Sequence, residues 1–154
     1  MTTQHEFAQW FEAAPDPRLP QLQSTIGYVN SFAPDLWDHM DRIPMMPSEV
    51  GAAVLAELLE LACQCQNFGN IHTGRYGLGR IPKEWLVLNI ECAAEPILTE
   101  GGEWEYQRFL EFYLWHDGRL FQGLIDRGLQ SDNPEIREAA EDMLQLKSSW
   151  ASTP

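Results

Sequence analysis

Apolar residues recur three or four positions apart along most of the chain, which is the spacing of an amphipathic helix. The clearest stretch covers residues 102–146 and contains three consecutive segments with this pattern. Asp117-Gly118 separates the first segment from the second, and a polar stretch over 128–134 separates the second from the third. Either Asp132 or Asn133 is suited to cap the third segment, since short polar side chains accept hydrogen bonds from the first backbone N–H groups of a helix. The pattern therefore predicts three helices that follow one another closely.

A second strong pattern begins at Ser48, a good helix-capping residue, and continues to Cys65. It predicts a long helix that is buried over much of its circumference. The glycine-rich stretch 67–82 comes next, and we expect it to be irregular. Pro82 then begins a further helix that extends to about Leu98.

The first 47 residues contain shorter apolar groups and several prolines. The spacing predicts a short helix over 4–13, a loop or extended arm over 15–24, and one or two short helices over 25–42. Prolines disfavour helix at the residue that precedes them, so they divide this region. We therefore expect an arm with short helices over 1–47.

No run of residues alternates between apolar and polar over the length of a strand. The chain has 154 residues, which is about the length of one domain. We therefore expect an all-α fold in which residues 1–154 form a single helical bundle of six or seven helices. Its helical core covers 48–146, and 147–154 form a tail.

The segment 124–144 resembles the turn and second helix of a HEAT-type repeat, in which a polar turn leads into a helix bearing an arginine and small residues. The residues that carry this resemblance are Asp132, Pro134, Ile136, Arg137, Ala139 and Ala140. The resemblance implies stacked helix pairs in the C-terminal half. No second copy occurs at the repeat distance of about 40 residues that such arrays require.

The chain carries 23 acidic and 10 basic residues, and its net charge is -13. A field of this sign repels nucleic acids and anionic lipids and attracts basic proteins. We therefore expect a basic protein partner and no direct contact with nucleic acid. No stretch approaches the roughly 20 apolar residues that cross a bilayer, so we expect no membrane association either.

Three cysteines occur, which is an odd number, and two of them lie two positions apart in the predicted long helix. Cys63 and Cys65 would then point in different directions, so neither a disulfide nor a shared metal ion is expected. We expect buried, reduced thiols and a cytoplasmic protein.

No motif for catalysis, for a cofactor or for a metal ion is present. The glycine-rich stretch lacks the Lys-Ser or Lys-Thr ending of a phosphate-binding loop, and no histidine has a second ligand at helical spacing. One local basic cluster, of Arg75, Arg80 and Lys83, is suited to neutralise nearby carboxylates or to hold an acidic group of a partner. We therefore assign no catalytic, cofactor-binding or metal-binding residues and do not expect an enzyme.

Six glutamates and no lysine or arginine lie over residues 84–107. Helix ends and a Gly-Gly turn place these carboxylates in one region, which is either a solubilising surface or an interface. Trp104 favours the interface, because tryptophan is enriched among the residues that dominate binding energy, although it is also a common core residue. The candidate partner-binding residues are Glu91, Glu95, Glu100, Glu103, Trp104 and Glu105.

Together these features predict an acidic, helical protein-binding module. Its size, charge and lack of catalytic motifs are similar in outline to those of bacterial immunity proteins, which implies an inhibitor that neutralises a basic toxin or enzyme. Two alternatives remain open. One is a HEAT-like scaffold or assembly subunit of a larger complex, and the other is an enzyme whose site is dispersed along the chain.

Overall fold

The computed structural model describes residues 2–151, which form helices and contain no β-strand. This confirms the predicted all-α fold. The described residues form eight α-helices and one 3₁₀ segment, more than the six or seven helices expected. These elements are α1 (Gln4–Glu12), α2 (Pro20–Asn30), η1 (Leu36–Met45), α3 (Ser48–Ala62), α4 (Phe68–Gly79), α5 (Lys83–Glu100), α6 (Glu103–His116), α7 (Gly118–Leu129) and α8 (Pro134–Ala151).

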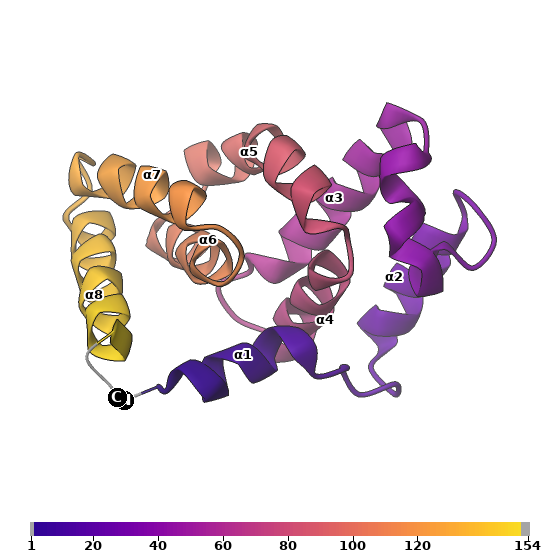
Figure 1. Cartoon of the computed structure of the whole chain (residues 1–154), viewed down its shortest axis with the longest axis horizontal. Helices are drawn as coiled ribbons and strands as arrows, with labels where there is room; N and C mark the ends of the chain where they lie inside the picture. The colour runs from indigo at the N-terminus through magenta and orange to yellow at the C-terminus, as the bar shows by residue number, and fades with distance from the viewer. Residues whose placement is uncertain (1, 152–154) are drawn as a thin grey trace.

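From α2 at one end to α8 at the other, the helices cross the molecule broadly in chain order, and α1 lies along one side of them (Figure 1). α7 and α8 lie at one end and pack against α6 and against each other. α3 and α4 lie near the middle and pack closely together, and α5 packs against both α3 and α6. α2 lies at the other end, and α1 runs along one side between the two ends and contacts α4. Buried apolar residues from α1 through α8 form one continuous core.

The glycine-rich stretch forms helix α4, so the expectation of an irregular segment is wrong. Its glycines let two helices approach each other closely. A Cβ atom added to Gly74 would lie 2.5 Å from the backbone N of Ala62 and 2.6 Å from the carbonyl O of Leu58, both in α3. Glycine lowers helix stability by about 1 kcal/mol relative to alanine in isolation. Here the absence of a side chain permits packing of α4 against α3.

Two boundaries in the first half differ from the expected ones. α2 begins at Pro20, within the predicted loop over 15–24, because proline is well tolerated in the first turn of a helix, where its missing N–H has no partner to lose. Ser48 is the first residue of α3 and not its cap. Pro47 occupies the cap position, and no side chain caps this end of the helix.

The C-terminal end is helical further than expected. Residues 147–151 of the predicted tail belong to α8, and 152–154 lie outside the described residues. The indole Nε1 of Trp150 donates a hydrogen bond to the carbonyl O of Thr2 (3.0 Å), and the ring centroids of Trp150 and Phe7 are 5.2 Å apart. Asn133 accepts a hydrogen bond from the backbone N of Glu135 (2.9 Å), as predicted for a residue that caps this helix. The two ends of the chain are therefore tied together by α1 and α8.

The cysteines do not occupy the predicted positions. α3 ends at Ala62, so Cys65 lies beyond the helix and is exposed. Cys63 is buried, whereas Cys92 is exposed. All three are free thiols. The expectation of buried thiols is therefore correct only for Cys63.

Candidate functional site

The six candidate partner-binding residues lie on the second half of α5 and the first turn of α6. Glu91, Glu95, Glu100 and Trp104 are exposed, and Glu103 and Glu105 are partly exposed. Half of the Trp104 side chain is accessible (50%), so this residue is not part of the buried core. Its position is compatible with contact to a partner.

Two of these glutamates are paired with arginines of α7. Glu95 accepts hydrogen bonds from both terminal nitrogens of Arg127 (2.8 and 3.2 Å), and these bonds lower the pKa of its carboxyl group. Glu91 lies 3.7 Å from Arg119. The stretch 84–107 lacks basic residues in sequence, but α7 supplies two in space. This part of the predicted surface is therefore a mixed-charge contact between α5 and α7.

Two of the remaining glutamates lie on a separate feature of the surface. Glu100 and Glu105 line a groove of about 530 Å³ together with Glu57 and Glu60 of α3. We call this feature the acidic groove. Its other lining residues are Gln21, Leu61, Cys63, Gln64, Ile97 and Gly101. Thus the structure joins two of the predicted residues to two glutamates that sequence analysis did not select.

The glutamates of the acidic groove form no ion pair with a described residue. None of its lining residues within the described chain is basic, and none of the ion pairs over residues 2–151 involves Glu57, Glu60 or Glu100. Glu105 has a local role as well, because its carboxylate accepts a hydrogen bond from the backbone N of Gly102 (2.9 Å) at the start of α6. Chemically, the groove is suited to hold lysine or arginine side chains.

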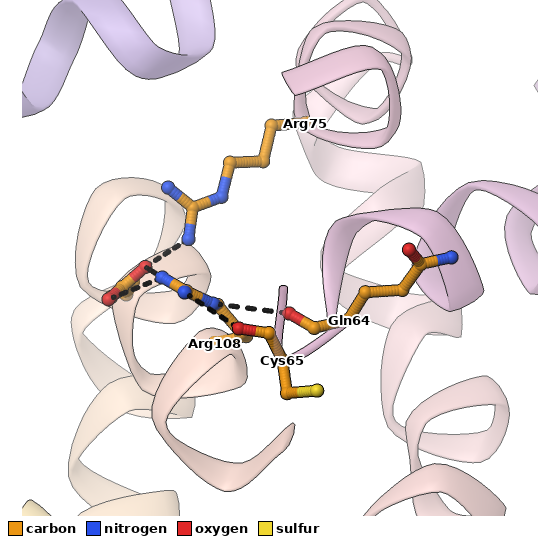
Figure 2. Close-up of polar contacts among 5 residues, drawn as sticks. Gln64, Cys65, Arg75 and Arg108 are labelled. Atoms are coloured by element: carbon orange, nitrogen blue, oxygen red, sulfur yellow. Dashed lines mark hydrogen bonds and ion pairs between the residues drawn. The ribbon is translucent and has the colours of Figure 1, made fainter. Parts of the chain in front are cut away.

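A second polar feature lies inside the molecule, where α4 and α6 meet. Two arginines converge on the carboxylate of Glu111 in α6 (Figure 2). Arg75 of α4 donates a hydrogen bond to Glu111 through Nη2, and Nη1 of Arg108 lies 3.3 Å from both carboxylate oxygens. Arg108 also donates to the carbonyl O atoms of Gln64 and Cys65, each at 3.3 Å. We call these three charged residues the Arg75–Glu111–Arg108 cluster.

Arg75 is almost completely buried, with 2% of its surface exposed. Burial lowers the pKa of its guanidinium group, but arginine remains protonated in proteins because the guanidinium is a very weak acid. The guanidinium carbon lies 5.4 Å from the ring centroid of Trp10 and 5.0 Å from that of Phe11, both in α1. Nε of Arg75 is buried and has no hydrogen-bond partner among the described residues. The cluster therefore connects three helices and leaves the buried Nε of Arg75 unpaired.

A hollow of about 340 Å³ opens beside this cluster, between α1 and α4. We call it the α1–α4 hollow. Its lining residues are Gln9, Trp10, Phe68, Ile71, His72, Arg75 and Arg108. His72 is engaged with the backbone, since its Nε2 lies 2.5 Å from the carbonyl O of Ala13. The remaining walls are largely aromatic and aliphatic.

The predicted basic cluster of Arg75, Arg80 and Lys83 does not form one surface. Arg75 is buried and neutralises Glu111, the guanidinium of Arg80 lies over the rings of Trp37 and Tyr76, and Lys83 is exposed. Of the two roles considered for this cluster, Arg75 performs the neutralisation of a carboxylate. The sequence spacing was misleading because Arg75 lies within α4, Arg80 follows the end of that helix, and Lys83 begins α5.

His116 is another buried titratable group, at the end of α6. Its ring stacks on Phe112 with the centroids 4.1 Å apart, and it also contacts Phe11. Burial lowers its pKa to about 4, and its Nδ1 has no hydrogen-bond partner among the described residues. A neutral imidazole in this apolar setting is a packing residue. No acidic or nucleophilic group is seen to be oriented by it.

Two further observations bear on the class of protein. Within residues 2–151, no helix has both the length and the apolar character needed to cross a lipid bilayer. In the same part of the chain, no three His, Cys, Asp or Glu side chains are grouped so that they could hold a metal ion.

No protein family, curated protein or solved structure was found to match this chain.

Proposed function

We propose that this protein binds a basic protein partner through the acidic groove and acts as an immunity- or inhibitor-type protein. The observation that carries the proposal is the convergence of Glu57, Glu60, Glu100 and Glu105 on one groove without a basic lining residue among those described. These glutamates come from α3, α5 and α6, so the fold brings together charges that are distant in sequence.

The overall charge supports the same proposal. A net charge of -13 attracts a cationic protein over several ångströms, and complementary charge mainly increases the rate of association. The groove is built on helices that pack in the core, so little conformational entropy is lost on binding. An inhibitor of a basic toxin or nucleic-acid-acting enzyme needs both properties. The three free cysteines favour a reducing compartment, and we place the protein in the cytoplasm on that basis.

A HEAT-like scaffold is the second candidate. One observation favours it: Arg137, the arginine of the resemblance, donates a hydrogen bond to the carbonyl O of Ser131 (2.5 Å) in the turn between α7 and α8. This bond gives the arginine a role in the turn. A scaffold would bind several subunits of one assembly, whereas an inhibitor would bind a single partner.

Affinity capture with matched charge variants tests the proposal. The groove variant is Glu57→Gln, Glu60→Gln and Glu100→Gln. The control variant is Glu135→Gln, Glu138→Gln and Glu141→Gln on exposed positions of α8, which lies at one end of the molecule (Figure 1). Both variants lose three negative charges, so only the position of the charge differs.

We expect the wild-type protein and the α8 variant to retain one basic protein in a stoichiometric complex, and the groove variant to lose it. The loss should be due to slower association, and it should shrink as salt concentration rises. Equal retention by the two variants would exclude the groove as the binding surface. Recovery of the same multi-subunit assembly by all three proteins would favour the scaffold.

A further inference from the structure

The α1–α4 hollow combines an apolar wall with a buried positive charge, and neither feature is used by the acidic groove. Its volume of about 340 Å³ lies within the range of small-molecule sites, which is about 300–1,000 Å³. Trp10 of α1 and Phe68 at the start of α4 line the hollow. Both side chains are more exposed than is usual for large apolar residues (42% and 78%). Large aromatic side chains in such positions commonly contact a ligand.

The charges at the base of the hollow do not cancel. Arg75 and Arg108 carry two positive charges, and Glu111 carries the one negative charge that they share. The Arg75–Glu111–Arg108 cluster therefore has a net charge of about +1, in a protein whose total charge is strongly negative. A buried guanidinium whose positive charge is only partly neutralised is unfavourable, and an anion beside it neutralises the remaining charge.

The hydrogen bonds of Arg75 are also incomplete. Only its Nη2 donates to Glu111, and Nε is buried with no partner within residues 2–151. Nη1 forms no hydrogen bond with a described residue, and it points away from Nη2 and the carboxylate that Nη2 contacts (Figure 2). Buried polar groups are almost always paired with protein, water or a ligand, so an arginine with an unpaired Nε beside a hollow indicates a place for an acceptor.

We propose that the α1–α4 hollow binds a small organic carboxylate that carries an apolar or aromatic group. The carboxylate lies against the guanidinium of Arg75, and the apolar group packs between Trp10 and Phe68. Carboxylate is the natural complement of a guanidinium, since the planar fork of N–H donors matches its two oxygens. The Nε2 of His72 is not available to the carboxylate, because it is already engaged with the carbonyl O of Ala13.

This ligand class follows from the dimensions and chemistry of the hollow. An inorganic anion would leave the aromatic wall exposed, and a neutral apolar molecule would leave the Nε of Arg75 without an acceptor. A cation is excluded by the sign of the cluster. The site is separate from the acidic groove, so the proposal does not depend on the proposed protein partner.

Binding of 3-phenylpropionate, monitored by NMR with the ¹⁵N-labelled full-length protein, tests the proposal. The amide 3-phenylpropanamide has the same shape and no charge, so it serves as the matched ligand control. We expect the carboxylate to bind and the amide to bind at least about tenfold more weakly, because the amide offers the guanidinium no negative charge. The Nε–H signal of Arg75 should shift with the carboxylate, because it belongs to the guanidinium that receives the anion.

Two protein variants locate the binding site. Phe68→Ala should lower the affinity for 3-phenylpropionate by about fivefold to tenfold, because an apolar contact is lost. Leu88→Ala removes an equally exposed apolar side chain from α5, outside the hollow, and should leave the affinity unchanged. Both side chains are mostly exposed (78% and 82%), so both variants should fold, which a thermal melt verifies.

Three results would overturn the proposal. The first is that 3-phenylpropionate shows no binding at concentrations up to about 10 mM, at which even a weak complex would be detected. The second is equal affinity for the carboxylate and the amide. The third is unchanged binding in Phe68→Ala, or a loss of binding in Leu88→Ala, because either would place the ligand elsewhere.

Discussion

Arg75 of α4 and Glu111 of α6 lie 36 positions apart in sequence and form a buried ion pair. The pair joins two helices near the centre of the fold. Arg108 completes the contact from the other side of the carboxylate. Glu111 is therefore the only negative charge in a cluster with two arginines.

Glu111→Gln should lower the free energy of unfolding by about 3–5 kcal/mol, because it leaves the buried charge of Arg75 without a counter-ion. Glu95→Gln is the matched control, since it breaks a solvent-exposed pair with Arg127 and should lower stability by less than about 1 kcal/mol. Urea denaturation of both variants measures these values. Equal destabilisation would mean that burial of the pair makes no difference to its contribution.

The close approach of α3 and α4 at Gly74 leads to a second prediction. Gly74→Ala should destabilise the fold by about 2 kcal/mol or more, because the new Cβ would meet backbone atoms of Ala62 and Leu58 that cannot move aside as a side chain would. Gly27→Ala in α2 has no atom within 4 Å of the new Cβ and should stabilise by about 0.5–1 kcal/mol. Thermal and urea unfolding distinguish the two. Equal effects on stability would contradict the packing role of Gly74.

Gly74 also shows why part of the fold could not be predicted. Most helices follow from apolar spacing, and the boundary at Asp117 follows from its ability to cap α7, where it accepts a hydrogen bond from the backbone N of Leu120 (2.9 Å). α4 lacks a strong apolar stripe because its contact face is made by glycine. Glycine lowers intrinsic helix propensity, so sequence reasoning favoured an irregular segment. Only the position of α3 explains why the segment is helical.

The site was predicted in part for a similar reason. Glu100 and Glu105 were identified from local charge, but Glu57 and Glu60 belong to another helix and were not selected. The stretch 84–107 contains no basic residue, yet α7 brings Arg127 to Glu95. Contacts between distant segments depend on helix packing, which one sequence does not specify. The spacing of residues along α3 does not indicate that this helix shares a groove with α5.

The buried imidazole of His116 predicts a dependence of stability on pH. Its pKa is about 4 in the folded protein and about 6.5 when unfolded, so between these values the unfolded state binds the extra proton. The contribution of His116 to the free energy of unfolding is therefore fully present above about pH 6.5. It is lost as pH falls towards 4. The expected loss is on the order of 3 kcal/mol, with Lys83 contributing to the low pKa in addition to burial.

His116→Phe should remove this dependence while keeping the stacked ring against Phe112. Urea denaturation between pH 4 and pH 7.5 gives the free energy of unfolding of both proteins. The difference between the two isolates the contribution of His116, since they share all other titrating groups. The variant should gain stability relative to the wild type as pH falls. A pH-independent difference would show that His116 titrates as it does in the unfolded chain.

The cysteines should differ in reactivity. Burial raises the pKa of Cys63 far above its usual range, whereas Cys65 and Cys92 are exposed. Because the thiolate is the reactive form, a thiol reagent should modify two cysteines in the folded protein and the third only after unfolding. Mass spectrometry identifies the modified positions. Rapid modification of Cys63 under native conditions would contradict the packing at the end of α3.

The partner-binding role of the acidic groove is tested most directly by site-specific photo-crosslinking in the cells that naturally make the protein. A photoreactive amino acid is placed at Glu60, on the groove, and in a second protein at Glu141, on the exposed side of α8. We predict that position 60 crosslinks to one protein with an excess of lysine and arginine, that position 141 does not, and that high salt abolishes the product. Equal crosslinking at both positions, or a partner without excess positive charge at position 60, would contradict this account.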